Sequence, residues 1–350
     1  MNPLNHPVSE LAVTAVDNLG DAAVSAVTQQ IYERHPALLQ RFGKAGQENC
    51  REDLHFHLSY LKAALHGSNN TLFSDYVLWL ASVLESRNVP AGHLSESLLL
   101  MQEFFKSQLA QTEAGTINAV WQAGIDALSL APAEAPSYQR LLPVALPQSQ
   151  GYLQSLLNNN RQSALQVLLG SLNNETSLID AGMGVIQPAM YEIGALWQRN
   201  RITVAQEHLA TAITQHAMAV AFSRADFDAP LQRKAMFACV PDNQHSLGLR
   251  MVSDAFELKG WEVQYLGANV PANDLLAQVD MWKPEFLGLS FSLPGHIRTT
   301  RLLVQKLRTE LGTRCPTILA GGLASNQAEG LWKATGADLW AANTKDSLRE

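Results

Sequence analysis

Apolar residues recur three and four positions apart along most of the first 130 residues. The spacing is clearest in four stretches, residues 11–32, 53–65, 72–84 and 94–109. It predicts amphipathic helices, because positions three and four apart share one face of a helix. Proline, glycine and asparagine interrupt the pattern at three places, His35-Pro36, residues 67–70 and residues 89–92. We therefore expect residues 1–131 to form an all-α domain.

The next segment breaks this periodicity and then resumes it. Pro132, Pro136, Pro143 and Pro147 all lie within residues 132–150. Because proline fixes φ and has no N–H donor, this stretch is expected to be a linker. Helical periodicity returns over residues 151–228 with a single internal proline, Pro188, and predicts a four-helix bundle.

From Lys234 onward, short apolar runs alternate with helical segments. The runs are residues 234–240, 262–267, 286–292, 317–322 and 338–343. The helical segments are residues 246–260, 273–282, 296–311 and 326–335. This alternation is typical of a doubly wound, five-stranded parallel sheet, and it predicts a Rossmann-like domain over residues 229–350. Ligands of such folds bind in the loops at the carboxyl ends of the strands.

The composition narrows the function. With 47% hydrophobic and 16% charged residues, the chain is expected to be globular. A formal net charge of −7 without a basic cluster argues against direct binding to nucleic acid. Neither a signal peptide nor an apolar run of about 18 residues is present, so no membrane partner is expected. Three widely spaced cysteines offer neither a disulfide framework nor a CxxC metal site and favour the cytoplasm.

Three strand-end loops carry residues that could bind a cofactor. They contain His245 and Gly248, Ser290 and Ser292, and Gly321 and Gly322, respectively. Taken alone, a histidine in a polar loop needs no metal, and paired glycines can simply make a turn. Together and in this order, the loops resemble the cobalamin-binding fold of methionine synthases, corrinoid proteins and mutases. The motif of that family is Asp-x-His-x-x-Gly, then a Ser-x-Leu variant, then Gly-Gly.

The resemblance implies a role for each residue. His245 would replace the cofactor's own dimethylbenzimidazole as the lower cobalt ligand, and Gly248 would admit the corrin. A channel for the displaced nucleotide tail would be lined by Ser290, Ser292, Gly321 and Gly322. The family's acidic residue two positions before the histidine is Asn243 here. We expect its amide to orient the imidazole without adding charge, which gives a weaker lower ligand.

The bundle carries a second motif, in which Trp197 is followed after nine residues by Glu207-His208. A lone tryptophan in a bundle usually belongs to the core. The arrangement nevertheless resembles light-sensing, adenosylcobalamin-binding regulators of the MerR type. In those proteins the tryptophan packs on the adenosyl group and the glutamate bonds its ribose, so the resemblance implies these roles for Trp197 and Glu207, with His208 beside them. Gln198 stands where the light-dependent repressors have a cobalt-binding histidine, so a bis-histidine photoproduct through that position is not expected.

The N-terminal domain contains a segment that resembles the chromophore helix of the globin-like phycobiliproteins. Cys50 and Asp53 keep the spacing of the family's bilin-attaching cysteine and pyrrole-binding aspartate, whereas Arg51 is displaced by one residue, about 100° around the helix. His57 and Tyr60 follow along the same helix. Together with the cobalamin motif, the layout looks like that of photocobilins, which implies biliverdin as a second chromophore. A cofactor-free globin-like domain remains an alternative, as does haem bound by His55, His57 or His66.

These resemblances predict a cobalamin-binding photoreceptor rather than an enzyme. Light would break the adenosyl–cobalt bond and so change the conformation and the binding of a downstream signalling protein. The alternatives are a corrinoid methyl carrier of a methyltransferase system and a light-independent, cobalamin-responsive antirepressor. No winged-helix DNA-binding domain is recognised in the chain, so direct repression is not expected. A homodimer is expected from the exposed helical face of the N-terminal domain.

Overall fold

The computed structural model describes residues 7–130, 144–172, 177–327 and 330–349. The chain divides into two compact units, residues 1–137 and residues 138–350. Most of the expected linker, residues 131–143, lies outside the described residues. Its last residues do not continue as a linker, because a helix begins at Gln148 directly after Pro147.

The described part of unit 1 is helical throughout. Its helices are α1 (Pro7–Arg34), α2 (Pro36–Gly67), α3 (Asn70–Ser86), α4 (Ala91–Gln108) and α5 (Gln111–Leu130). The breaks between the first four lie where the sequence predicts them, and Gly43, at φ 64°, adds a kink inside α2. Large aromatic side chains of α3, α4 and α5 fill the core, among them Phe73, Phe105 and Trp121. Trp121 meets Phe73 edge-on, with ring centroids 5.0 Å apart.

Unit 2 begins with the predicted helical bundle. It contains α6 (Gln148–Leu157), α7 (Arg161–Ser171), α8 (Leu178–Ala181), α9 (Gln187–Gln198) and α10 (Val204–Phe222). A π-helical turn, Gly182–Ile186, joins α8 to α9 without a break. Its cause lies in Pro188, which has no N–H to donate to the carbonyl oxygen of Gly184. The Leu146 N–H donates to that oxygen instead, at 2.8 Å, so the carbonyl stays satisfied.

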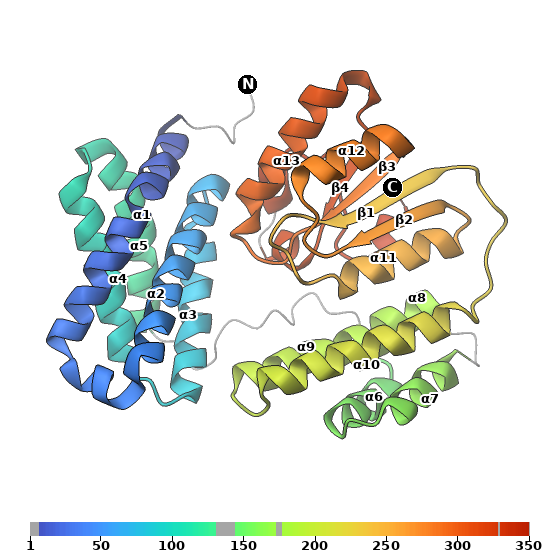
Figure 1. Ribbon diagram of the computed structural model, residues 1–350, viewed down its shortest axis with the longest axis horizontal. Helices are drawn as coiled ribbons and strands as arrows, with labels where there is room; N and C mark the ends of the chain where they lie inside the picture. The colour runs from blue at the N-terminus through green and yellow to red at the C-terminus, as the bar shows by residue number, and fades with distance from the viewer. Residues whose placement is uncertain (1–6, 131–143, 173–176, 328–329, 350) are drawn as a thin grey trace. The chain divides into compact units, whose positions relative to one another are not determined.

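The sheet of unit 2 confirms the predicted fold class. Its strands are β1 (Lys234–Cys239), β2 (Glu262–Gly267), β3 (Phe286–Ser290), β4 (Thr317–Gly321) and β5 (Leu339–Trp340). All pairs are parallel, and the order is β2-β1-β3-β4-β5. Helix α11 (Leu247–Leu258) covers one face, whereas α12 (Ala272–Trp282) and α13 (His296–Leu311) cover the other (Figure 1). The direction of winding therefore reverses between β1 and β3, where a ligand of such a sheet binds.

The last crossover differs from the prediction. The helix expected over residues 326–335 is replaced by two 3₁₀ turns, Leu323–Asn326 and Leu331–Thr335, in the described part of this segment. Gly330 and Gly336 bound the second turn in the left-handed conformation, which a continuous helix does not tolerate.

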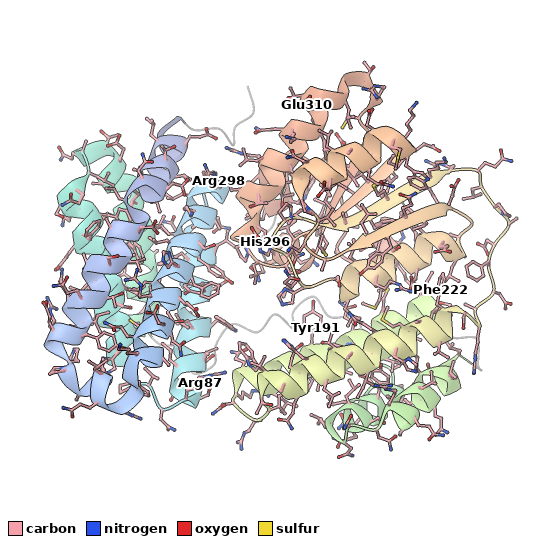
Figure 2. The ribbon with its side chains drawn as sticks, viewed as in Figure 1. Arg87, Tyr191, Phe222, His296, Arg298 and Glu310 are labelled. Carbon is pink, nitrogen blue, oxygen red and sulfur yellow. The ribbon has the colours of Figure 1, made fainter. Side chains whose placement is uncertain are left out.

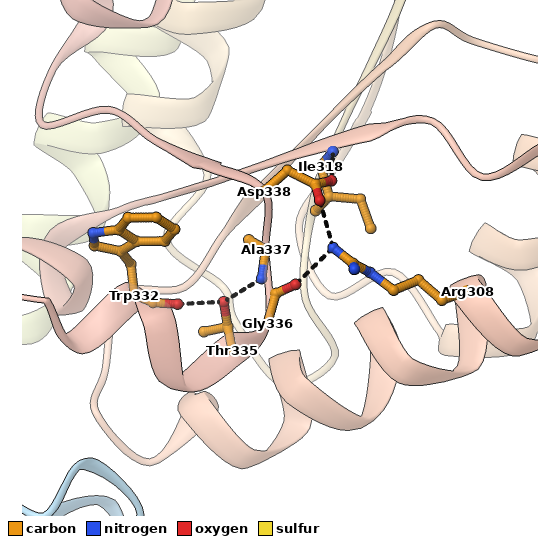
Figure 3. A network of polar contacts seen from close by, with 7 residues as sticks. All are labelled: Arg308, Ile318, Trp332, Thr335, Gly336, Ala337 and Asp338. Carbon is orange, nitrogen blue, oxygen red and sulfur yellow. Dashed lines mark hydrogen bonds and ion pairs between the residues drawn. The ribbon is translucent and has the colours of Figure 1, made fainter. Parts of the chain in front are cut away.

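Polar contacts stabilise this short connection in place of a packed helix (Figure 3). One Nη of Arg308 donates to the Gly336 carbonyl at 2.8 Å and to the Asp338 carboxylate at 2.6 Å. The other carboxylate oxygen of Asp338 accepts the Ile318 N–H of β4 at 2.8 Å. The edge strand β5 is therefore fixed to α13 and β4.

Bundle and sheet domain share an interface along α11. Leu247 and Met251 of α11 pack against the apolar core of the bundle. Near the chain's end, Lys345 pairs with Asp180 of α8 at 2.5 Å. In the part of the chain that the structure describes, no helix is long and apolar enough to cross a membrane.

Candidate functional site

The loop after β1 is held in place by hydrogen bonds within the loop and to Asn269 and Ser290 outside it. Asp242 takes the left-handed conformation, at φ 69°, and its N–H donates to the side-chain oxygen of Asn269 at 2.8 Å. Asn243 is fully buried, and its amide nitrogen donates to the Ser290 carbonyl at 2.9 Å. Its amide oxygen accepts the His245 N–H at 3.2 Å. Asn243 therefore joins the β1 loop to the end of β3.

This geometry differs from the orienting role expected for Asn243. Both ends of its amide are used by backbone groups, so the side chain fixes the loop rather than the imidazole. His245 and Gly248 are exposed at the carboxyl end of β1. Among the described residues, no protein group is hydrogen-bonded to the imidazole nitrogens of His245. The result is a rigid backbone that presents an accessible imidazole.

A second histidine, His296, lies at this edge of the sheet and was not singled out from the sequence. It is the first residue of α13 (Figure 2), directly after the loop that carries Ser290 and Ser292. Burial lowers the pKa of His296, the Asp242 carboxylate opposes this shift, and His245 adds to it, so the three side chains share one electrostatic environment. Its Nδ1 is buried without a hydrogen-bond partner among the described residues. Its position, six residues after the end of a strand at the switch point, was the available signal.

The serines and glycines assigned to the tail channel lie at the adjacent strand ends. Ser290 and Ser292 are both buried. Gly322 has φ 103°, and a Cβ there would lie 2.4 Å from the Phe291 carbonyl oxygen. Only glycine fits that position, because the backbones after β3 and β4 approach so closely. At Gly321 a Cβ would stay 3.9 Å from the nearest atom outside its chain neighbours, so this position has room for a side chain.

The tryptophan and glutamate of the bundle motif flank one tight turn. The Asn200 N–H donates to the Trp197 carbonyl at 2.9 Å, which closes the end of α9. Thr203 and Gln206 then form a capping box that starts α10. Trp197 is half-buried against the bundle core, and Glu207 lies in the first turn of α10. The turn therefore brings both residues to the same end of the bundle.

The Glu207 carboxylate already has two partners. His208 contacts one oxygen through Nδ1 at 2.5 Å, and the Thr211 hydroxyl donates to the other at 3.0 Å. The His208 side chain is 74% exposed. A ligand hydroxyl can therefore reach Glu207 by replacing His208 without disturbing any packed side chain.

In unit 1, the residues expected near a bilin follow one face of α2. His57 is 1% exposed, and its Nδ1 and Nε2 contact the Tyr76 hydroxyl at 2.8 Å and the Ser97 hydroxyl at 3.3 Å. Tyr60 stacks on Tyr76, with centroids 3.9 Å apart. Burial lowers the pKa of His57 to about 3, so the ring is neutral at physiological pH. His57 and Tyr60 are thus packed into the core of this unit.

Cys50 and Asp53 are half-buried one turn apart on α2. Burial, with Asp53 nearby, raises the pKa of the Cys50 thiol to about 11. Burial also raises the pKa of Asp53 to about 6, with Glu52 adding to the shift. Arg51 contacts Ser25 of α1 at 3.5 Å instead of facing Asp53. A protonated thiol is a weak nucleophile, so this environment disfavours thioether formation.

Comparison with known proteins supports cobalamin as the cofactor. Residues 233–349 and residues 148–221 each match a family model described as a B12 binding domain. These matches cover the predicted sheet domain and bundle, and they confirm the cobalamin prediction at this level.

Three curated relatives are similar to parts of the chain. The HTH-type transcriptional repressor CarH of Myxococcus xanthus is 33% identical over 147 residues, which is 41% of this chain and 48% of the relative. CarA of the same organism, also an HTH-type transcriptional repressor, is 32% identical over 31% of this chain and 35% of its own length. Dimethylamine corrinoid protein 3 of Methanosarcina acetivorans is 23% identical over 49% of this chain and 78% of its own length. The matched part of this chain thus spans about half or less of the two repressors.

Proposed function

We propose that this protein is a cytoplasmic photoreceptor that binds adenosylcobalamin in unit 2, with His245 as the lower cobalt ligand. The observation that carries the proposal is the exposed imidazole of His245 on a loop locked by Asn243. An accessible imidazole on a rigid backbone suits a cobalt ligand, since little is lost in ordering it. Two residues later, Leu247 packs on the bundle that carries Trp197 and Glu207.

The chain's own residues would hold the cofactor from both domains. Ser290 and Ser292 would bond the displaced nucleotide tail, next to the close approach at Gly322. Trp197 would pack on the adenosyl group, and Glu207 would accept a hydrogen bond from its ribose. When bound, the cofactor would supply a cobalt–carbon bond that light can break.

Signalling would follow from the interface between bundle and sheet domain. Contacts of Trp197 and Glu207 with a bound adenosyl group would favour one arrangement of the two domains, so their loss would shift the population of states. We propose a downstream protein as the receiver of this change and no catalytic role for the chain. CarH and CarA, whose names describe transcriptional repressors, support a regulatory function.

Illumination of the full-length protein loaded with adenosylcobalamin tests this proposal. Hydrodynamic size or oligomeric state, measured by light scattering before and after green light, is expected to change. Trp197→Ala should reduce the preference for adenosylcobalamin over methylcobalamin. If light changes neither the size nor the oligomeric state, and Trp197→Ala keeps the wild-type cofactor preference, the photoreceptor proposal fails while cobalamin binding stands.

A corrinoid methyl carrier is the second candidate for unit 2, supported by the similarity to dimethylamine corrinoid protein 3 over most of that protein's length. A carrier needs an open upper face, whereas a Trp197 packed over the corrin would block it. Equal affinity for methylcobalamin and adenosylcobalamin would favour the carrier.

For unit 1 we propose non-covalent binding of biliverdin near Cys50 and Asp53. A half-buried carboxylate with a raised pKa would be stabilised by pyrrole N–H donors, which is what supports the proposal. The high pKa of Cys50 favours binding without a thioether. Adding biliverdin and recording a saturable, red-shifted absorption band tests this, with zinc-stained denaturing gels to detect a covalent bond. Without such a band, unit 1 is a cofactor-free or haem-binding helical domain.

A further inference from the structure

A cluster of three metal-ligating side chains lies in unit 1, away from Cys50 and Asp53. Helix α1 ends at Arg34 and α2 begins at Pro36, so His35 is the single residue between them. His93 and Glu96 lie in the first two turns of α4. One ligand atom from each of His35, His93 and Glu96 lies within 4.8 Å of the other two.

The backbone fixes all three positions. His35 is the N-cap of α2, and Pro36 restricts the residue before it. His93 and Glu96 are three residues apart, so their side chains share one face of α4. The two imidazole rings stand nearly perpendicular, at 86°, with centroids 5.0 Å apart. Only side-chain rotations are needed to direct the three ligand atoms at one point.

The carboxylate is already oriented for such a point. Arg34 holds one oxygen of Glu96 at 3.1 Å, and the second oxygen contacts His35 Nε2 at 2.6 Å. Partial burial raises the pKa of Glu96, but the hydrogen bonds from His35 and Arg34 outweigh it and lower the pKa below its ordinary value. The carboxylate is therefore ionised at neutral pH, with one oxygen held by Arg34 and the other directed at His35.

We propose that His35, His93 and Glu96 bind a divalent transition-metal ion of the zinc type. Two imidazoles and one carboxylate are a ligand set that zinc uses when it keeps a further position for water. All three residues are half-buried, so their side chains are accessible to solvent and to a metal ion. The ion replaces the hydrogen between His35 and Glu96, which leaves as a proton, while Arg34 continues to orient the carboxylate from outside.

The cluster also has a metal-free explanation, an ion pair that ties the α1–α2 junction to α4. His93 distinguishes the metal site from this metal-free ion pair. The ion pair joins Glu96 to Arg34 and His35, whereas His93 meets the group through the edge of its ring against His35. Replacement of His93 therefore leaves the ion pair in place and removes one metal ligand.

Zinc titration of the tag-free, full-length protein by calorimetry tests the site. We expect one zinc ion per chain, and His93→Ala and Glu96→Gln should each weaken binding at least about tenfold. His55→Ala, which removes an exposed histidine of α2 outside the cluster, should leave the zinc affinity unchanged. Wild-type protein that binds no zinc, or a His93→Ala variant that keeps the wild-type affinity, would overturn the proposal.

His93→Cys distinguishes lost ligation from lost folding. A thiolate at this position should retain the metal and, with cobalt(II) in cobalamin-free protein, add a thiolate-to-cobalt charge-transfer band that wild type lacks. A folded His93→Cys variant without that band would also contradict the site. None of these readouts depends on cobalamin or on bilin.

Discussion

His245 in the sheet domain and His57 in the N-terminal unit are both candidate cofactor residues in opposite surroundings. His245 is exposed on a loop whose backbone is held by Asn243, and its imidazole is accessible. His57 is 1% exposed, with both ring nitrogens in contact with hydroxyl groups. At His245 the protein fixes the backbone and leaves the imidazole ring free for a ligand. At His57 the ring itself forms hydrogen bonds within the core.

This difference separates the proposed ligand from a structural residue. A ligand must exchange water for metal at little cost, which His245 can do on a preformed loop. For His57 to bind a cofactor, the Tyr76 hydroxyl would have to lose its buried hydrogen-bond partner, at about 1–3 kcal/mol. The Ser97 hydroxyl would lose one partner and keep its bond to the Leu94 carbonyl. We therefore expect a cobalt ligand at His245, and we expect any bilin in unit 1 to contact Asp53 before His57.

The largest effect is expected from His245→Ala. Loss of the lower ligand should change the visible spectrum of bound adenosylcobalamin and weaken binding by about tenfold or more. Absorption spectra and a binding titration in the dark measure both. His296→Ala is the matched control, because His296 shares the electrostatic environment of His245. If the control changes the spectrum and His245→Ala does not, His296 is the ligand.

Asn243→Ala tests the locked backbone. It removes a donor to the Ser290 carbonyl and an acceptor for the His245 N–H in a fully buried position. The Ser290 carbonyl keeps a second donor, the Val240 N–H at 3.1 Å, so the loss of these two hydrogen bonds should lower the free energy of unfolding of unit 2 by about 1–3 kcal/mol. Chemical denaturation followed by circular dichroism measures this.

Asn243→Asp separates the two contacts of Asn243. It keeps an acceptor for His245 and loses the donor to Ser290, so it should destabilise unit 2 as well. If this variant is instead as stable as wild type and binds cobalamin more tightly, Asn243 acts through the imidazole, as in the sequence-based expectation.

Local patterns predicted more of the fold than of the site. The strands and the breaks at His35-Pro36 and around Asn69 follow from periodicity and turn residues, which act over a few positions. The replacement of the last helix by 3₁₀ turns had a local signal in Gly330 and Gly336, whereas the contacts of Arg308 that hold this connection are long-range. The sequence shows Pro188 but not its structural consequence. The hydrogen bond from the Leu146 N–H that satisfies the Gly184 carbonyl joins residues about 40 positions apart.

The site shows the same division. His245, Ser290 and Ser292 were proposed from their places at predicted strand ends and from the resemblance to cobalamin-binding proteins, and the structure places them at or just after the ends of β1 and β3. The backbone role of Asn243 was not, because the sequence does not show which groups a buried amide will meet. The proximity of His296 to His245 likewise depends on how α13 folds back on the sheet. Secondary structure follows local chemistry, whereas the pairing of polar groups follows tertiary packing.

Because His57 is buried, we expect the free energy of unfolding of unit 1 to fall at acid pH, an effect that an exposed histidine would not produce. Its pKa of about 3 in the folded protein lies below the ordinary value of 6.5, so the unfolded state binds the proton more tightly. The stabilisation is complete above pH 6.5 and is lost as pH falls towards 3, by about 1.4 kcal/mol per pH unit. Asp53, with a raised pKa of about 6, opposes this slope between its ordinary value of 3.8 and pH 6. Asp53→Asn protein should therefore show the slope in denaturation measured from pH 7 to 5, and Asp53→Asn/His57→Gln should show a much smaller one.

The smallest effect is expected from Asp53→Asn alone, and it bears on the bilin. Above pH 6 the wild-type carboxylate is charged and partly buried, so the neutral amide should modestly raise the stability of unit 1 at pH 7.5 and leave it unchanged near pH 4. Because pyrrole N–H groups favour the charged form, bound biliverdin should reverse the order: wild type gains more stability from it than Asp53→Asn does. Thermal unfolding of each protein at both pH values, with and without biliverdin, measures these differences, and His55→Gln is the control for a change elsewhere on α2. Equal stabilisation of wild type and Asp53→Asn by biliverdin would place the chromophore away from Asp53. If biliverdin stabilises neither protein, unit 1 does not bind it, and the half-buried Asp53 carboxylate has no role in bilin binding.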